Sequence, residues 1–149
     1  MDTILKTYNY KHWSANIAGF DKQTGGYVVT HKGHRFDIKT GDFEKRTAGV
    51  LMRNGYQVEF MDESAYGRKQ HDVRVHGVPT EIKVMEGYRN IRKRAEMASE
   101  QGASRVLYYI GFDDNIAMFK RFRNVHRTVK GIKEIGYVKN GKLHYYIDK

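Results

Sequence analysis

The segment that most constrains the fold is HDVRVHGVPTEIK, residues 71–83, in which apolar and polar residues alternate on either side of a glycine. Alternation with a period of two is typical of a strand with one face on a core, and a glycine between two such runs is typical of a tight turn. We expect Gly77 and Val78 to form the two-residue loop of a β-hairpin. Its apolar face would carry Val73, Val75, Ile82 and Val84. Its other face would carry four charged residues, Asp72, Arg74, Glu81 and Lys83.

This predicted register places Arg74 opposite Glu81 and Asp72 opposite Lys83. Two exposed cross-strand ion pairs would each contribute at most about 1 kcal/mol, so ordinary solvated surface is one interpretation of the charged face. A functional site is the other interpretation, and the hairpin by itself does not decide between the two.

A second carboxylate-bearing element is the helix predicted for GDFEKRTAGVLMRNG, residues 41–55, with Asp42 as its N-cap and Gly55 as its C-terminal stop. At 100° per residue its apolar arc contains Phe43, Thr47, Ala48, Val50 and Leu51. Glu44 falls inside this arc. A carboxylate in the first turn gains about 0.3–1 kcal/mol from the helix dipole, which explains its position along the helix but not its inward direction.

The remaining elements follow from the same periodicities and turn signals. They are strands at 27–30, 56–61 and 105–112, helices at 90–102 and 114–129, and a hairpin at 134–148 around Asn140-Gly141. We expect Asp113 or Asp114 to cap the helix at 114–129. The order predicts an α/β fold in which a central mixed β-sheet is flanked by helices and followed by a C-terminal β-hairpin.

The length of 149 residues fits one domain. We expect residues 1–40 to form an N-terminal extension, residues 41–112 the core that carries the charged residues, and residues 113–149 the last helix and hairpin. His31 and His34 lie three apart but lack an obvious third metal ligand, so we expect surface or hydrogen-bonding histidines.

The charge of the chain points to a polyanionic partner. Lys and Arg number 27 and Asp and Glu 17, a net charge of +10. The region from Arg89 to Lys133 alone contains eleven basic and four acidic side chains. Nucleic acid is the natural partner of such a chain, because each phosphate that is neutralised releases condensed counterions.

Composition also excludes several classes. The absence of cysteine rules out disulfides, thiolate catalysis and cysteine-ligated zinc. No apolar run is long enough to span a bilayer, and the first residues lack the apolar core of a signal peptide. We therefore expect a cytoplasmic site of action and no membrane partner.

An inward Glu44 on a helix packed over a sheet that carries Asp72 and Glu81 suggests a cluster of carboxylates around a cation. Mg²⁺ prefers such a site, with one or two carboxylates and substrate phosphate oxygens among its ligands. Lys83, two residues from Glu81, points to the same side of the strand, where it could orient or deprotonate an attacking water.

The pattern of Glu44 on the first helix, then Asp72, then Glu81-Ile82-Lys83 resembles the PD-(D/E)XK nuclease superfamily, whose restriction-endonuclease-like fold has an αβββαβ core. Within it, GRKQHDVRVHGVPTEIK and the later AEMASEQGA are similar to nuclease domains of bacterial polymorphic and contact-dependent inhibition toxins. Related domains occur in phage and mobile-element proteins. The residue before Asp72 is His71, where the superfamily's name has proline.

The resemblance implies a metal-dependent nuclease that hydrolyses phosphodiester bonds in DNA or RNA, with Mg²⁺ or Mn²⁺ as cofactor. Asp72, Glu81 and the backbone carbonyl of Ile82 would hold the metal, Lys83 would position or activate the water, and Glu44 would support the metal or a second one. A toxin of this kind would have an immunity protein as its partner.

Basic and polar residues of the second helix are the ones we expect along the nucleic acid backbone. They are Arg89, Asn90, Arg92, Lys93, Arg94 and Gln101. Three alternatives stay open: a Holliday-junction-type resolvase acting as a homodimer, a nucleic-acid-binding protein without turnover, and a structural phage-associated protein. The sequence leaves open the choice between DNA and RNA, and the oligomeric state.

Overall fold

The computed structural model describes residues 15–61 and 73–147 of the chain. Its strands are β1 (Ala15–Phe20), β2 (Tyr27–His31), β3 (Gln57–Phe60), β4 (Val73–Val75), β5 (Val78–Met85), β6 (Arg105–Ile110), β7 (Glu134–Lys139) and β8 (Lys142–Tyr145). Its helices are α2 (Gly41–Arg53), α3 (Ile91–Glu100) and α4 (Ile116–Thr128).

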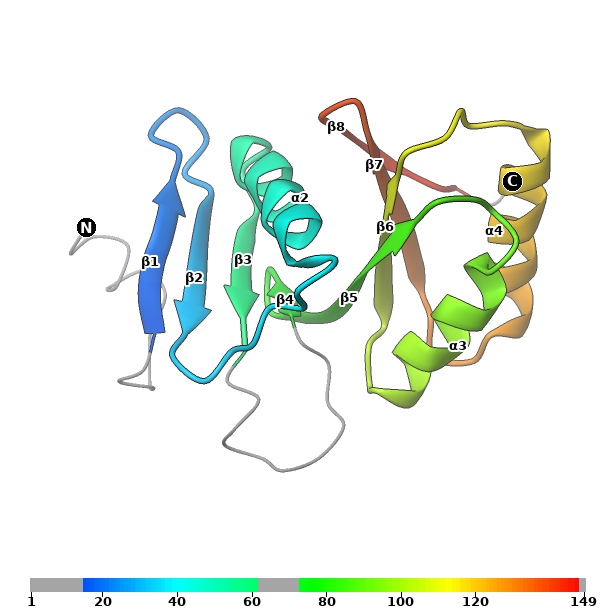
Figure 1. The fold of residues 1–149 in the computed structure, drawn as a ribbon, viewed down its shortest axis with the longest axis horizontal. Helices are drawn as coiled ribbons and strands as arrows, with labels where there is room; N and C mark the ends of the chain where they lie inside the picture. The colour runs from blue at the N-terminus through cyan, green and yellow to red at the C-terminus, as the bar shows by residue number, and fades with distance from the viewer. Residues whose placement is uncertain (1–14, 62–72, 148–149) are drawn as a thin grey trace.

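The eight strands form one sheet in the order β1-β2-β3-β4-β5-β6-β7-β8 (Figure 1). The pairs β2–β3, β5–β6 and β6–β7 are parallel and the other pairs are antiparallel. A mixed sheet with helices and a C-terminal hairpin confirms the predicted fold class. Strand β1 was not predicted. Both β1 and β2 belong to the sheet, although they lie within residues 1–40, which we expected to form an N-terminal extension.

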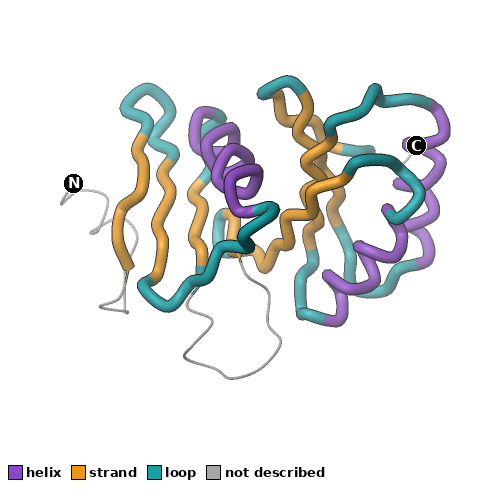
Figure 2. The backbone as a smooth tube through the Cα atoms, in the orientation of Figure 1, coloured by secondary structure: helices purple, strands orange, loops and turns teal. Residues whose placement is uncertain are grey.

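The helices gather at two places along the sheet, α2 near β3 and β4 and the pair α3 and α4 at the other end, with β5 running between them (Figures 1 and 2). Ala48 and Leu51 of α2 pack with alternate residues of β3, β4 and β5, among them Val75 and Ile82. The helices α3 and α4 pack with Met85 of β5 and with β6 and β7. Because Ile82 and Met85 point to opposite faces of β5, the two helical groups cover opposite faces of the sheet.

The predicted arc of α2 is confirmed in its interior, since Thr47, Ala48, Val50 and Leu51 are buried. The predicted caps are wrong in two helices. The N-cap position of α2 is Thr40, and Asp42 lies inside the first turn. The N-cap of α4 is Asn115, whose Oδ1 accepts a hydrogen bond from the Met118 backbone N–H.

The hairpin β4–β5 forms as predicted but with a different register. Its turn residues are His76 and Gly77, with φ of 51° and 78°, and Arg74 faces Pro79 rather than Glu81. A type I′ turn needs positive φ at both central residues, which glycine adopts freely and a β-branched valine does not, so Val78 belongs to the strand. The slip is two residues, which preserves the faces: Val73, Val75 and Ile82 are buried in the cluster with α2 as expected.

The turn contains a histidine whose charge the fold disfavours. Burial and then the nearby charge of Arg105 lower the pKa of His76 below its ordinary value of 6.5. The Gln57 backbone N–H also donates to His76 Nδ1 at 3.4 Å, which requires that nitrogen to be unprotonated.

We expect His76→Asn to change how stability depends on pH. A depressed pKa in the folded state gives stability that is present above the unfolded pKa and is lost as the pH falls. Asparagine tolerates positive φ and does not titrate. The free energy of unfolding of the wild type should therefore fall relative to that of the variant between about pH 8 and about pH 5. Chemical denaturation of both proteins across this range measures it, and a constant difference would contradict the assignment.

Candidate functional site

A buried carboxylate beside an amine is the central feature of β5. The side chain of Glu81 is almost fully buried, with 2% of the residue exposed. Lys83 is half-buried, and its Nζ lies 3.7 Å from Glu81 Oε2. The two side chains project from the same face because they are two residues apart in a strand. Burying a carboxylate is costly unless it is paired or coordinated, so this pair is unusual for a solvated hairpin surface.

The two neighbours of β5 pair with different parts of the strand. Strand β4 pairs with Val78–Thr80, whereas β6 on the other side pairs with Thr80–Met85. Within the residues that the structure describes, the β4 side of β5 therefore has no strand partner from Glu81 onward. Ile82, predicted to supply a carbonyl ligand, lies in this stretch.

Glu44 lies in the first turn of α2 and is half-buried, as its inward direction on the helical wheel predicts. Its Oε1 accepts a hydrogen bond from Thr40 Oγ1 at 3.3 Å. The helix α2 covers the face of β5 that carries Ile82, and Glu81 with Lys83 lies on the other face. Glu44 and the pair of Glu81 and Lys83 therefore lie toward different faces of β5.

Asp72, the third predicted carboxylate, lies outside the described residues. Among residues 15–61 and 73–147, no three His, Asp or Glu side chains are grouped closely enough to hold a metal ion. The predicted metal site therefore depends on Asp72 joining Glu81, and it stays a prediction.

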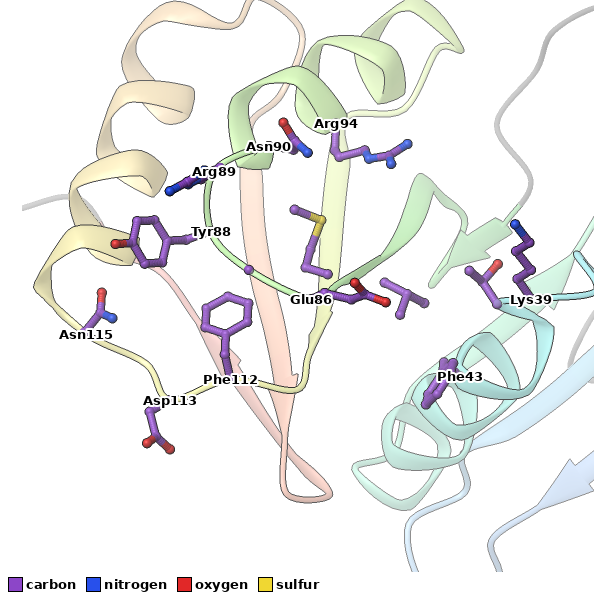
Figure 3. Close-up of a pocket in the computed structure, with 14 residues that line it drawn as sticks. Lys39, Phe43, Glu86, Tyr88, Arg89, Asn90, Arg94, Phe112, Asp113 and Asn115 are labelled. Atoms are coloured by element: carbon purple, nitrogen blue, oxygen red, sulfur yellow. The ribbon is translucent and has the colours of Figure 1, made fainter.

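A cavity of about 810 Å³ adjoins these residues, and we call it the α2–α3 cavity (Figure 3). It is lined by Lys39, Thr40, Phe43, Val84, Met85, Glu86, Gly87, Tyr88, Arg89, Asn90, Arg94, Phe112, Asp113 and Asn115. These residues come from the start of α2, the C-terminal end of β5, the start of α3 and the loop after β6. The carboxyl ends of parallel strands are where α/β sheets generally bind ligands.

The cavity wall contains a residue next to Lys83 and a residue hydrogen-bonded to Glu44. Val84 follows Lys83 in the strand, and Thr40 is the residue that donates to Glu44. Sequence reasoning missed the cavity because its walls come from four separate segments. In the structure Glu86 and Phe112 lie just after the ends of the parallel strands β5 and β6, whereas Phe112 was predicted to be inside a strand.

The predicted nucleic-acid contacts divide into two groups. Arg89, Asn90 and Arg94 line the α2–α3 cavity. Gln101 is the C-cap residue at the other end of α3, about 15 Å away along a helix that rises 1.5 Å per residue. The structure therefore brings only part of the predicted set together.

Arg92 does not line the cavity and instead connects α3 to α4. Its Nε donates to Glu96 Oε1 at 2.7 Å, and its Nη1 donates to Asn124 Oδ1 at 2.6 Å and to the Thr128 hydroxyl. The neighbouring Lys93 is exposed. These contacts give Arg92 a structural role between α3 and α4.

A second polar cluster crosses β2, β3 and β4. His31 is buried, and its Nε2 lies 2.8 Å from Glu59 Oε2. Glu59 faces Arg74 across the β3–β4 ladder. Burial raises the pKa of the Glu59 carboxyl against the opposing effect of the Arg74 guanidinium. Of the two expected hydrogen-bonding histidines, His31 is therefore internal rather than on the surface, and His34 Nδ1 contacts the Met61 carbonyl oxygen at 2.8 Å.

No protein-family model matches the chain, and no curated protein is significantly similar to it. Among solved structures, its fold is similar to that of a chain of the CdiA-CT/CdiI toxin and immunity complex from Burkholderia pseudomallei. The TM-score is 0.55 and the sequence identity 15%, over 77% of this chain and 90% of the other. The two chains therefore share a fold. Within the described parts of this chain, no helix has the length and apolar character to cross a membrane.

We expect Arg92→Ala and Lys93→Ala to differ although the residues are neighbours. Loss of the Arg92 contacts should lower the free energy of unfolding by about 1 kcal/mol, whereas Lys93→Ala should change it by less than about 0.5 kcal/mol. Thermal or chemical denaturation measures both. Equal stability of the two variants would show that the link between α3 and α4 contributes nothing measurable.

Proposed function

We propose that this protein is a metal-dependent nuclease that hydrolyses phosphodiester bonds, and that it acts as a toxin domain of the contact-dependent inhibition type. The observation that carries the proposal is the buried Glu81 with Lys83 beside it on the same face of β5. Buried ionisable groups on one face of a strand are enriched at functional sites, so the pair of Glu81 and Lys83 supports the proposal.

The donor set of β5 fits a hard cation such as Mg²⁺ or Mn²⁺, which binds carboxylate and carbonyl oxygens. In this proposal Glu81, the carbonyl of Ile82 and Asp72, which directly precedes β4 in the sequence, would hold the metal, and Glu44 would support it from the helix. When bound, the metal would supply stabilisation of the negative charge that develops on the phosphate.

Lys83 would act on the attacking water. Its Nζ lies 3.7 Å from Glu81 Oε2, and in this proposal it would hold or activate the water that attacks the phosphate. Arg89 and Arg94 at the α2–α3 cavity would bind the adjacent phosphates, because guanidinium groups match phosphate oxygens in geometry and charge. The +10 charge of the chain favours the encounter with nucleic acid.

The site assignment predicts that Glu81→Gln and Lys83→Ala each reduce cleavage at least about 100-fold, because each removes a group that stabilises or prepares the transition state. Cleavage of duplex DNA, single-stranded DNA and RNA in Mg²⁺, Mn²⁺ or EDTA measures the effect, and EDTA should abolish it. Glu100→Gln and Lys142→Ala, at exposed positions outside the site, are the matched controls.

Removing only one partner of a buried pair can also unfold a protein. The double variant Glu81→Gln with Lys83→Met, which removes both charges, separates this effect from loss of chemistry: it should unfold at a temperature close to that of the wild type and be inactive. Wild-type activity in the folded single variants would end the site assignment.

The toxin assignment is supported by the shared fold with a chain of a toxin and immunity complex. In a bacterial expression host, the wild type should arrest growth and Glu81→Gln should relieve the arrest, because toxicity would depend on the same site. An immunity protein that binds the chain should restore growth without mutation. Growth curves with matched protein levels measure this, and equal growth with both forms would argue for the resolvase or binding-protein alternatives.

A further inference from the structure

We propose that the α2–α3 cavity binds one unpaired nucleobase of the nucleic acid substrate, which makes single strands and loops the preferred substrates over duplexes. This inference rests on the proposed nuclease function, since the cavity adjoins its catalytic residues. Val84 in the cavity wall directly follows Lys83, and Thr40 bonds to Glu44. In this proposal the base enters the cavity and the phosphate of the same nucleotide lies toward the candidate site.

Aromatic rings line the cavity on two sides. Tyr88 and Phe112 lie together with ring centroids 6.3 Å apart, and Phe43 of α2 lies on the side across from them (Figure 3). The guanidinium of Arg121 packs 5.1 Å from the Tyr88 ring centroid and so helps to hold that ring in place. Bases taken out of a helix stack on aromatic side chains, whatever their sequence.

The polar groups of the cavity suit a whole nucleotide, with its base as well as its phosphate. Lys39, Arg89 and Arg94 line it and would attract a phosphate, whereas Glu86 lines it as an acceptor for a base. Carboxylates accept hydrogen bonds from the N–H groups of base edges, and the amides of Asn90 and Asn115 both donate and accept.

The size of the cavity and its location at strand ends agree with this occupant. A volume of about 810 Å³ lies within the range of roughly 300–1,000 Å³ that is typical of pockets for small ligands. A base within a duplex is stacked and paired, and must leave the stack before it can enter such a pocket. A base that is already unpaired avoids that cost.

The test is binding of a fluorescent single strand of about 12 nucleotides, and of the matching duplex, to the full chain in EDTA. Tyr88→Leu and Phe112→Leu should weaken single-strand binding about 5- to 100-fold, because each removes a stacking surface, and should leave duplex binding unchanged. Tyr88→Phe keeps the ring and should bind like the wild type. Phe20→Ala removes an exposed aromatic on β1, outside the cavity, and should also have no effect.

Unchanged single-strand affinity in whichever leucine variants retain the wild-type unfolding temperature would overturn the inference, as would tighter binding of the duplex. The outcome is separable from the nuclease proposal. If single-strand binding does not depend on Tyr88 and Phe112 but cleavage still requires Glu81 and Lys83, only the proposal of a base pocket is contradicted. If single-strand binding depends on the two rings but no form of the protein cleaves nucleic acid, only the nuclease proposal is contradicted.

Discussion

The structure depends most on how β5 accommodates the carboxylate of Glu81. The strand lies in the middle of the sheet and is flanked by helices on both faces, so nearly every side chain on it is apolar or paired. Glu81 is buried there with an ammonium 3.7 Å away. A buried ion pair rarely improves stability over apolar residues of the same size, and this is the physical reason why the pair supports the proposed function.

Strands, helices and a cavity surround the part of β5 that carries Glu81 and Lys83. Among the described residues, β4 pairs with Val78–Thr80 of β5 and β6 pairs with Thr80–Met85. The α2 helix lies on one face of β5, α3 and α4 lie on the other, and the α2–α3 cavity opens at the end of the strand. A carboxylate and an amine therefore lie within a few residues of a cavity lined by charged and aromatic side chains.

The hairpin shows why sequence reasoning can identify a site and still misplace its partners. A slip of two residues leaves every side chain on its face, so Glu81 and Lys83 shared a side in either register. It changes the cross-strand neighbours completely, and Arg74 faces Pro79 and not Glu81. The turn decided the register, because only His76-Gly77 could adopt two positive φ angles.

The sequence by itself determined the order of the elements from β2 onward, the mixed sheet with its C-terminal hairpin, and the placement of Glu81 and Lys83 on one face of a strand. These follow from local periodicity and turn chemistry, which a chain carries in neighbouring residues. Only the tertiary structure decided that Arg92 joins two helices, that Gln101 lies far from Arg89, and that Phe43, Tyr88 and Phe112 surround one cavity. Such relations arise when segments distant in the chain pack together, and no short-range pattern encodes them.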